Sequence, residues 1–502
     1  MVNEKKQVVG VIGAGTMGRG IVQLFAQNGH QVHLYDSAQE AVLSAMSSIL
    51  QMIDKLANKG RIEQSTATIA KNNLNHAEHI KDLAVCDIVI EAIVENIDIK
   101  RSVFQQLEEV VSANCILASN TSSLLIADIS AACTLPNRVV GMHFFNPVPL
   151  MKLVEIISSV RTSENTLITA QNLINSVGHV AVLAKDQPGF LVNHAGRGLY
   201  TEGLRILEEQ VASVADIDQV LREACGFKMG PFELLDLTGL DVSGKVMESI
   251  YQQFQQEAMF RPSTLVPPRI AANLLGRKTG EGWYQYEDGK KVEDKLSSLP
   301  VLSESLSIWI DPDADEYADL RDLFSEAGIS VVTEAKQDSI LVIQPWGKDV
   351  SQVCEDKGLD ATRVVAIDPL FKESKRRTIM STMIVQPEYI ANIHASLVRS
   401  GHSVTVIKDS PGFISQRVLA VIINIASNIA QRGVASVTDI DIAVKFGLGY
   451  PHGPLSWGDK VGTQNIVKIL DGLFEVTRDP RYRTSMWLRR RAQLNVSLLT
   501  ED

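Results

Sequence analysis

A glycine-rich loop between an apolar run and an amphipathic segment is the feature that most constrains the beginning of this chain. Residues 8–12 form an apolar run of the β type, and Gly13-Ala14-Gly15-Thr16-Met17-Gly18 follows it directly. Apolar residues then recur with helical spacing up to Asn28-Gly29, where glycine can adopt the left-handed conformation that ends a helix. The three loop glycines suit a tight turn, close approach of the backbone to a pyrophosphate, and close packing of helix on strand. Together these features predict a dinucleotide-binding βαβ unit rather than an incidental turn.

The second expected strand, residues 31–35, ends at Asp36. A carboxylate at this place accepts a hydrogen bond from the adenosine ribose 2′-hydroxyl and repels a 2′-phosphate. The next residues, Ser37-Ala38-Gln39, include no arginine that would reverse this preference. We therefore expect the dinucleotide to be NAD rather than NADP.

A long helical region is expected from about Gln39 to Leu74, and it carries three cations close together, Lys55, Lys59 and Arg61. Two interpretations of this cluster stay open. The first, slightly favoured, is an ordinary solvated helix face, because lysine and arginine are mostly exposed. The second is a small basic patch that binds an anionic group of the substrate.

Two further strands are expected to end at the same edge of the sheet. One lies in "CDIVIEAIVEN" and is expected to end at Glu95, and the other, "CILAS", ends at Ser119. Residues just past the carboxyl ends of parallel strands face the ligand crevice. This placement favours Asn120 and Ser122 as site residues, although both residue types are also common in turns.

The stretch "GMHFFNPVPLMKLVE" places a histidine and a glutamate on two neighbouring strands. His143 ends one apolar run, Glu155 lies inside the next, and two prolines stiffen the short connection between them. Strands joined in this way are expected to lie side by side, so that Glu155 points among apolar neighbours, where a carboxylate needs a partner. A buried structural pair is the alternative interpretation. The position beside a nicotinamide cofactor favours a functional pair instead.

Part of the chain repeats with a constant offset. "KDQPGF" begins at Lys185 and "KDSPGF" at Lys408, which are 223 positions apart (408 − 185). The same offset relates "VASVADID" to "VASVTDID" further along. Because the offset is kept without a gap, residues 185–290 and 408–485 are predicted to be two copies of one helical domain.

The chain resembles the 3-hydroxyacyl-CoA dehydrogenase family through motifs that occur in the family's order between about residues 8 and 286. These motifs are "GAGTMGRGI", "EAIVEN", "ASNTSSL", "HFFNPVPLMKLVEII", "KDQPGFLVN", "GPFELLDLTGLDV" and "GRKTGEGWY". The length and the duplicated tail are most similar to the bacterial 3-hydroxyadipyl-CoA dehydrogenases of phenylacetate catabolism. The resemblance implies NAD-dependent oxidation of (S)-3-hydroxyacyl-CoA to 3-oxoacyl-CoA, as in fatty acid β-oxidation, with 3-hydroxyadipyl-CoA as the expected substrate.

The resemblance also implies roles for individual residues. His143 is the base that takes the proton of the C3 hydroxyl, and Glu155 orients its imidazole. Ser122 hydrogen-bonds the reacting oxygen, and Asn193 supports the same end of the substrate. For a CoA thioester, the basic patch is the candidate contact of the anionic nucleotide end, through Lys55 and Lys59. Besides the glycine loop and Asp36, the positions implied to line the cofactor are Glu95, Lys100, Asn146 and Lys278.

The region between the helical copies, roughly residues 293–405, is expected to be a second nucleotide-type domain that has lost the chemistry. "LSIWIDPD", "ISVVTE", "SILVIQPW" and "RVVAIDPL" predict strands, but no glycine loop follows the first of them. Asp368 stands in the place of His143, and no glutamate matches the one at 155. Gln416 stands in the place of Asn193.

The expected fold is a Rossmann-like α/β domain followed by an all-α helical domain, with this pair duplicated and the second copy degenerate. We expect the two helical copies to pair within the chain, which leaves further homo-oligomerisation open, and we expect one NAD site and one active site per chain. The expected domains are 1–184 (NAD-binding, with the histidine–glutamate pair), 185–291 (helical), 292–405 (degenerate Rossmann-like) and 406–502 (second helical).

Charge and composition restrict partners and location. The net charge of −11 argues against nucleic acid or a membrane surface as partner, because neutralising phosphates needs a basic face. The five cysteines lack metal-ligand or Cys-x-x-Cys spacing, so we expect free thiols, no metal and a cytoplasmic location. The apolar run near the N-terminus is too short and too glycine-rich for a signal peptide, and no stretch reaches the roughly 18 apolar residues of a membrane span.

Three alternatives compete with this function. The substrate could be the shorter 3-hydroxybutyryl-CoA, or it could be a free 3-hydroxy acid or sugar acid without CoA. A non-catalytic NAD-binding protein would share the fold, because a fold does not by itself prove activity. The complete set of Ser122, His143, Glu155 and Asn193 favours an enzyme.

Overall fold

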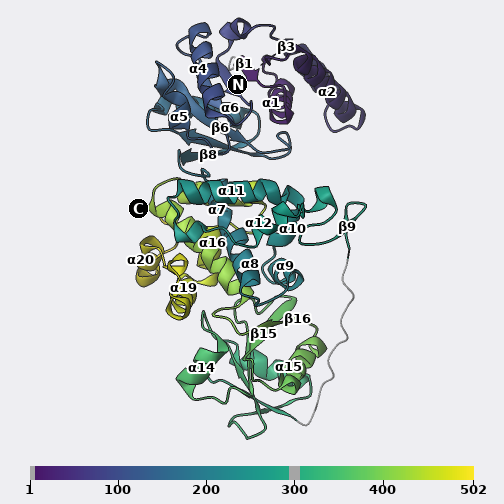
Figure 1. Ribbon diagram of the computed structural model, residues 1–502, viewed down its shortest axis with the longest axis vertical. Coiled ribbons are helices and arrows are strands. Elements are labelled where there is room, and N and C mark those ends of the chain that lie inside the picture. Colours follow the sequence, from purple (N-terminus) through teal and green to yellow (C-terminus); the bar gives the residue numbers. More distant parts are fainter. Residues whose placement is uncertain (1–5, 293–305, 502) are drawn as a thin grey trace. The chain divides into compact units, whose positions relative to one another are not determined.

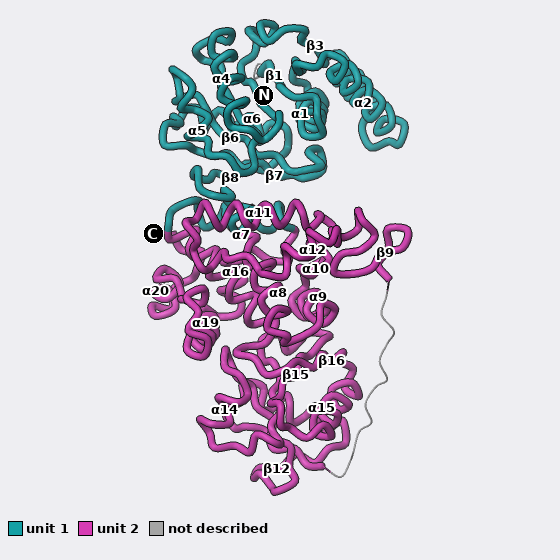
Figure 2. Tube along the Cα trace, viewed as in Figure 1, with its two compact units in different colours: residues 1–194, 432–448 teal, residues 195–431, 449–502 magenta. Residues whose placement is uncertain are grey.

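The computed structural model describes residues 6–292 and 306–501 of the chain (Figure 1). The chain forms two compact units, each made of two stretches of sequence (Figure 2): unit 1 comprises residues 1–194 and 432–448, and unit 2 comprises residues 195–431 and 449–502. The four-domain division expected from the sequence stays a prediction. Its second boundary adjoins residues 293–305, which lie outside the described residues. Residues 1–5, the start of the segment that we expect not to be a signal peptide, also lie outside them.

Unit 1 is built on an eight-stranded sheet with the strand order β3-β2-β1-β4-β5-β6-β7-β8. Neighbouring strands are parallel except for β6 and β7, which pair antiparallel. The strands are β1 Val9–Ile12, β2 Val32–Tyr35, β3 Leu74–His76, β4 Ile88–Glu91, β5 Ile116–Ser119, β6 Val139–Phe144, β7 Leu153–Ser158 and β8 Val180–Lys185.

Helices cover both faces of this sheet, because alternate residues of its strands are apolar on both sides. Val11 of β1 joins a core with Phe25 of α1, and Ile12 joins a separate core with Phe104 of α4. This doubly wound arrangement confirms the Rossmann-like fold class. The helices of unit 1 are α1 Thr16–Gln27, α2 Gln39–Asn58, α3 Gln64–Asn72, η1 Ile80–Val85, α4 Ile97–Val110, α5 Ile126–Ser130, η2 Pro136–Arg138, α6 Glu164–Ser176 and α17 Val437–Leu448.

The structure divides the long helical region expected from Gln39 to Leu74. The helix α2 ends at Asn58 and α3 begins at Gln64, with Gly60 at a φ of +64° in the turn between them. Glycine takes this left-handed conformation without a steric penalty, so it ends the helix where the apolar pattern alone would continue it.

Unit 2 contains a six-stranded sheet with the order β12-β11-β13-β14-β15-β16, in which only β14 and β15 pair antiparallel. The four strands expected from the sequence of the second copy are present as β11 to β14. The strands of unit 2 are the hairpin β9 Tyr286–Glu287 and β10 Lys290–Lys291, and the sheet strands β11 Ser307–Ile310, β12 Ser330–Val332, β13 Ile340–Ile343, β14 Val364–Ile367, β15 Arg376–Ser381 and β16 Ser403–Lys408.

The helices of unit 2 come from both helical copies and from the second sheet domain. A short helix, α7 Val192–Ala195, has its residues 192–194 in unit 1 and residue 195 in unit 2. The others are α8 Arg197–Glu208, α9 Val214–Glu223, α10 Pro231–Thr238, α11 Leu240–Gln253, η3 Ala258–Phe260, α12 Val266–Ala271, η4 Arg277–Thr279, α13 Tyr317–Glu326, α14 Val350–Lys357, α15 Pro387–Arg399, α16 Ile414–Gln431, α18 Pro454–Val461, α19 Thr463–Thr477, η5 Pro480–Tyr482 and α20 Met486–Leu494.

The aspartate of the repeated Lys-Asp motif binds the N-terminus of a helix in each copy. The Asp186 carboxylate accepts hydrogen bonds from the backbone N–H groups of Ile126 (3.0 Å) and Ala127 (2.8 Å), where α5 begins. Asp409, 223 positions later (409 − 186), accepts from the first two backbone N–H groups of α14 at 2.7 and 3.1 Å. A carboxylate at a helix N-terminus satisfies N–H groups that have no partner within the helix.

Each helical copy also lends a segment to the sheet of the other copy. In unit 1 the Lys185 backbone N–H, at the end of β8, donates to the Val434 carbonyl at 2.8 Å. In unit 2 the equivalent Lys408 backbone N–H, at the end of β16, donates to the Val211 carbonyl at 3.0 Å. The helices that follow these carbonyls lie against the sheets, α17 on β7 and β8, and α9 on β15. The duplicated chain therefore pairs with itself reciprocally, as two subunits do across a two-fold axis.

Within unit 2, α8 of the first helical copy packs directly on α16 of the second. A Cβ atom at Gly198 would lie 2.9 Å from the Ile422 side chain, so the glycine permits the close approach of the two helices. The buried Arg417 guanidinium in α16 pairs with Glu202 in α8 at 2.7 Å and also with Glu209 at 2.7 Å. In the described part of the chain, no helix is both long and apolar enough to cross a bilayer.

Candidate active site

The antiparallel pair β6–β7 brings His143 and Glu155 directly opposite each other. The His143 Nδ1 atom lies 2.5 Å from the Glu155 Oε2 atom, and both side chains are buried, with 6% and 0% of their surface exposed. Strands joined by a short, proline-stiffened connection were expected to lie side by side, and this expectation is confirmed. Burial shields the pair from water, so the His143 Nδ1 atom depends on Glu155 for its hydrogen bond.

The second carboxylate oxygen of Glu155 is held by backbone amides. The N–H groups of Leu191 and Val192 donate to the Oε1 atom at 2.9 and 2.8 Å. An ionised carboxylate only accepts hydrogen bonds, so Nδ1 of His143 must be the donor to Glu155. The opposite ring nitrogen, Nε2, is then the one that can accept a proton.

The loop between β6 and β7 is anchored on the dinucleotide-binding helix. A Cβ atom at Gly20, in α1, would lie 2.9 Å from the Val148 side chain, so this loop lies close to the helix backbone. The Phe145 ring centroid lies 4.4 Å from that of His143. Asn146, which the sequence predicts as a cofactor contact, is exposed in the same loop three residues after His143.

Ser122 and Glu95 meet in one network at the carboxyl ends of β4 and β5. The Glu95 Oε1 atom accepts hydrogen bonds from the Thr121 hydroxyl (2.6 Å) and from the backbone N–H groups of Ser122 (3.0 Å) and Ser123 (3.1 Å). Burial alone would raise the pKa of Glu95, but these hydrogen bonds and the Lys100 ammonium lower its pKa below the ordinary value. The carboxylate thereby stays charged and holds the serine loop.

Lys100 lies beneath this network and is completely buried. Its ammonium is 2.6 Å from Glu91 and 3.4 Å from Glu95. The implied role of Lys100 in lining the cofactor stays a prediction, and in this structure its ammonium lies between the two carboxylates and contacts Glu95. An ammonium buried in this way needs such partners, because an unpaired buried charge is strongly destabilising.

Glu91 also belongs to this network, although the sequence did not predict it as a site residue. Its Oε2 atom accepts from the Ser119 hydroxyl at 2.7 Å, and its Oε1 atom accepts from the Ile93 backbone N–H at 2.8 Å and from Lys100. The available signal was a carboxylate ending an otherwise apolar strand, with a lysine nine positions later. The other predicted neighbour, Asn120, accepts a hydrogen bond from the Phe144 backbone N–H at 2.8 Å and so ties β5 to the strand of His143.

A crevice of about 970 Å³ opens at the glycine loop, and Gly13, Gly15 and Asp36 are among its lining residues. Gly13 has a φ of +110°, and a Cβ atom there would lie 2.4 Å from the Ala92 carbonyl oxygen. A Cβ atom at Gly18 would lie 1.8 Å from the Gly13 carbonyl oxygen, so the last glycine serves helix–strand packing as predicted. A Cβ atom at Gly15 would meet nothing within 4 Å, which leaves its backbone open to a ligand.

The Asp36 carboxylate is positioned by the same loop. Its Oδ2 atom accepts a hydrogen bond from the Ala14 backbone N–H at 2.8 Å, and its Oδ1 atom accepts from the Ala38 backbone N–H at 3.0 Å. The crevice therefore has room for a dinucleotide, and no side chain covers the loop backbone at Gly15. It also presents a fixed acceptor at the place where the ribose hydroxyls of such a ligand belong.

The remaining predicted residues are Asn193, Lys278, Lys55 and Lys59. Asn193 follows Val192 in α7, next to the amides that hold Glu155. Lys278 belongs to unit 2, where its ammonium pairs with Asp241. Lys55 and Lys59 are exposed at the C-terminal end of α2.

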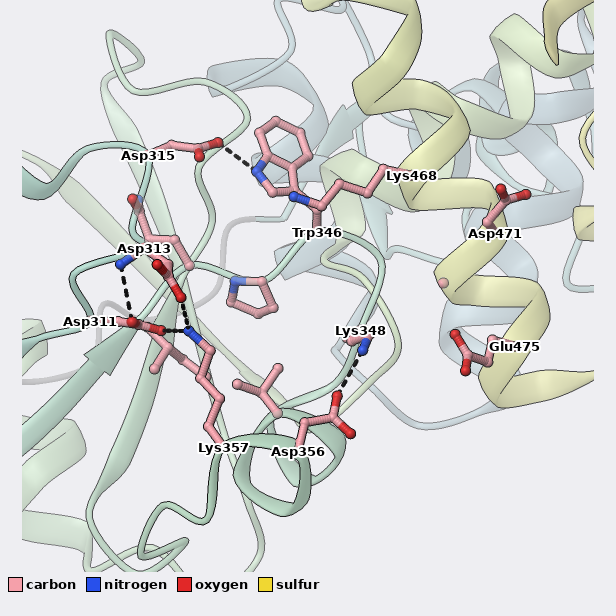
Figure 3. Close-up of a pocket in the computed structure, with 15 residues that line it drawn as sticks. Asp311, Asp313, Asp315, Trp346, Lys348, Asp356, Lys357, Lys468, Asp471 and Glu475 are labelled. Carbon is pink, nitrogen blue, oxygen red and sulfur yellow. Dashed lines mark hydrogen bonds and ion pairs between the residues drawn. The ribbon is translucent and has the colours of Figure 1, made fainter. Parts of the chain in front are cut away.

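In the second copy, the equivalent strand ends carry ion pairs (Figure 3). Asp311 directly follows β11, as Gly13 follows β1, and it borders a pocket of about 490 Å³ in unit 2. The Lys357 ammonium lies 2.5 Å from Asp311 and 2.8 Å from Asp313. The loop after β11 therefore presents charged side chains, whereas the corresponding glycine loop after β1 presents its backbone.

Asp368, in the place of the histidine, also has a structural environment. It accepts hydrogen bonds from the Ser415 hydroxyl, from Gln416 Nε2 at 3.0 Å and from the Leu370 backbone N–H at 3.0 Å. Burial raises the pKa of Asp368, although these hydrogen bonds act in the opposite direction. The three hydrogen bonds of this side chain all come from residues of its own copy.

Comparisons with known proteins agree with this geometry. The family model described as 3-hydroxyacyl-CoA dehydrogenase, NAD binding domain, matches residues 8–187, and the model of the C-terminal domain of the same family matches residues 189–286 and 412–497. The chain belongs to the 3-hydroxyacyl-CoA dehydrogenase family. The C-terminal model matches twice, which agrees with the duplication inferred from the constant offset.

Relatives of the family cover the whole chain or its first half. The 3-hydroxyadipyl-CoA dehydrogenase of Escherichia coli K12 is 37% identical over 97% of this chain and 98% of its own length. The 3-hydroxybutyryl-CoA dehydrogenase of Clostridioides difficile is 40% identical over 55% of this chain and 98% of its own length. A crystal structure of an Escherichia coli K12 3-hydroxybutyryl-CoA dehydrogenase covers 98% of this chain and 99% of its own, with a TM-score of 0.86 and 35% identity. As a family member, the chain is an oxidoreductase acting on 3-hydroxyacyl-CoA and carries the family's NAD-binding domain.

Proposed function

We propose that this chain oxidises the C3 hydroxyl of (S)-3-hydroxyadipyl-CoA with NAD. The His143–Glu155 pair of the first copy is the proposed general base. The observation that carries this proposal is the hydrogen-bond pattern of Glu155, whose two oxygens are bound by one imidazole and two backbone amides. That pattern leaves Nε2 of His143 as the acceptor for the proton of the substrate hydroxyl.

Each of the proposed catalytic residues of the first copy has a role in this reaction. His143 takes the hydroxyl proton, and Glu155 orients the imidazole and stabilises the imidazolium that forms. Ser122, on the loop held by Glu95, hydrogen-bonds the reacting oxygen, and Asn193 supports the same end of the substrate. NAD, held by the glycine loop and Asp36, would supply the hydride acceptor for C3 when bound.

The cofactor proposal rests on the glycine loop and Asp36. The open backbone at Gly15 and the N-terminus of α1 suit the pyrophosphate, because backbone N–H groups and the helix dipole favour negative charge there. The fixed Asp36 carboxylate accepts a ribose hydroxyl and disfavours a 2′-phosphate, so we propose NAD over NADP. Asn146 and Lys278 complete the proposed cofactor contacts, with the exposed Lys55 and Lys59 as the proposed contacts of the CoA nucleotide.

The adipyl substrate is supported by the name of the full-length relative at 37% identity, whereas the full-length structural neighbour carries the name 3-hydroxybutyryl-CoA dehydrogenase. A panel of initial rates separates these substrates. The purified full chain would be given 3-hydroxyadipyl-CoA, 3-hydroxybutyryl-CoA, a long-chain 3-hydroxyacyl-CoA and free 3-hydroxyadipate, each with NAD and with NADP.

We expect the highest kcat/KM for 3-hydroxyadipyl-CoA with NAD and no turnover of the free acid. A kcat/KM for the butyryl thioester equal to or above that for the adipyl thioester would replace the proposed substrate. Turnover of the free acid at a comparable rate would overturn the requirement for CoA.

A further inference from the structure

Helix α17 comes from the second helical copy but belongs to unit 1 together with the histidine–glutamate pair. It lies against β7 and β8, the last two strands of the sheet. The Val434 carbonyl before the helix accepts the Lys185 backbone N–H at 2.8 Å, and the Asp439 carboxylate in its first turn accepts the Leu183 backbone N–H at 3.4 Å. A segment of the degenerate copy is thus hydrogen-bonded to β8 and lies against β7, the strand that carries Glu155.

The contact is closest at Gly447, in the last turn of α17. A Cβ atom at this position would lie 2.9 Å from the Leu153 Cδ2 atom and 2.9 Å from both methyl groups of Val192. Glycine is a poor helix former, so a glycine inside a helix without a left-handed conformation needs another reason. Close packing of the helix backbone on Val192 and Leu153 supplies that reason.

Both residues that Gly447 touches are next to the catalytic carboxylate. The Val192 backbone N–H donates to the Glu155 Oε1 atom at 2.8 Å. Leu153 is two positions before Glu155 in β7, so the two side chains point to the same face of the sheet. Any displacement of Val192 away from α17 moves the amide that orients the carboxylate.

We propose that α17 is a positioning element of the active site and that Gly447 is its critical residue, seating Val192 so that its amide holds Glu155 against His143. The degenerate copy thereby contributes to catalysis without chemistry of its own. The inference rests on the roles proposed above for His143 and Glu155. It goes beyond them because it assigns the second copy a part in the first copy's site.

The test is the substitution Gly447→Ala in the full chain. Alanine favours the helix, so the variant should keep α17, but its Cβ atom pushes on Val192 and Leu153. Because a misplacement of about 1 Å can cost about 100-fold in rate, we expect kcat to fall by roughly 10- to 100-fold. The KM for acyl-CoA and the affinity for NAD should change little, since α17 contacts Val192 and Leu153 beside Glu155 and not the crevice at the glycine loop. Thr438→Ala, at an exposed position of the same helix, is the control for helix propensity and should keep the wild-type kcat.

A second substitution distinguishes this mechanism from a general loss of structure. Val192→Ala removes the two methyl groups that the new Cβ atom would meet, so Gly447→Ala/Val192→Ala should recover most of the kcat lost in the single variant. Additive losses in this double-mutant cycle would overturn the proposal, because they would mean that the two positions do not act on each other. So would a folded Gly447→Ala variant with wild-type kcat.

Two further outcomes are decisive. If Gly447→Ala alone fails to fold, the double variant is compared with Val192→Ala: a similar kcat supports the proposal, and an unfolded double variant overturns it. His143→Gln is measured in parallel. If His143→Gln keeps full activity, the proposed function itself fails; if it is impaired while Gly447→Ala is fully active, only the inference about α17 fails.

Discussion

Glu155 has no exposed surface and receives three hydrogen bonds, so the neighbouring imidazole is held in one orientation with one ring nitrogen free. Replacing His143 with glutamine keeps a hydrogen-bonding group beside Glu155 but removes the base. We expect kcat to fall by about 10²–10⁴-fold, as for the loss of a general base. Steady-state rates with saturating NAD and acyl-CoA measure this effect.

The affinity for NAD is the control for His143→Gln. It should change little, because the glycine loop and Asp36 are not altered. A variant with nearly full activity would remove the histidine from the mechanism.

Asp36 is the residue proposed to select NAD over NADP, and its carboxylate is held in place by the Ala14 and Ala38 amides. Asp36→Ala removes both the acceptor for the ribose hydroxyl and the charge that repels a 2′-phosphate. We expect weaker NAD binding and a smaller difference between NAD and NADP, measured as kcat/KM for each cofactor. Equal kcat/KM values for both cofactors in the unaltered enzyme would contradict the role of the carboxylate.

Residues were predictable from sequence where a local pattern named both the residue type and its position. The glycine loop and the His143–Glu155 pair are of this kind, because a strand–loop–helix order and a proline-stiffened connection fix the neighbours. Glu91 was not predictable in the same way. Its partners, Ser119 and Lys100, come from two other elements, and an isolated carboxylate at a strand end gives no sign of them.

At the scale of elements, the last turn of α2 and the turn that follows it carry the exposed cations Lys55, Lys59 and Arg61. Cations at a helix C-terminus are also favourable to the helix dipole, so a solvated helix end remains the competing interpretation. If they bind the CoA nucleotide, replacing all three with glutamine should raise the KM for acyl-CoA and reduce its dependence on salt, with kcat nearly unchanged. KM measured over a range of ionic strength tests this.

A control variant separates a local effect from a change of net charge. Three exposed lysines of unit 2 replaced by glutamine should leave the KM unchanged; suitable positions are Lys336, Lys375 and Lys460. An unchanged KM in the α2 variant as well would restore the interpretation as a solvated helix face.

Elements differed in how far the sequence predicted them. The strands β1, β2, β4 to β7 and β11 to β14 follow from apolar runs and turn residues, whereas β3, β8, β15 and β16 were not predicted. The division between α2 and α3 was missed because the apolar pattern continues across the turn at Gly60. The attachment of α17 to β7 was also missed, since the constant offset shows that α17 corresponds to α9 but not which sheet either helix contacts.

At the scale of the whole molecule, the duplication combines one copy that has the glycine loop and the His143–Glu155 pair with a second copy that has kept its strands. In the described part of the second copy, Asp311 and its ion pairs occupy the strand end that carries the glycine loop in the first copy, and Asp368 stands in the place of the histidine. The reciprocal contacts of Lys185 with Val434 and of Lys408 with Val211 join the copies within the units. We therefore expect one functional site per chain.

The most direct measurement of this claim is a calorimetric titration of the full chain with NAD, repeated for two matched variants. Gly13→Ala should abolish binding, because its Cβ atom would meet the Ala92 carbonyl at 2.4 Å. Asp311→Asn, at the equivalent position of the second copy, should leave binding unchanged. The account predicts one NAD site per chain that is lost only in the Gly13 variant; two sites per chain, or a site that survives Gly13→Ala, would contradict it.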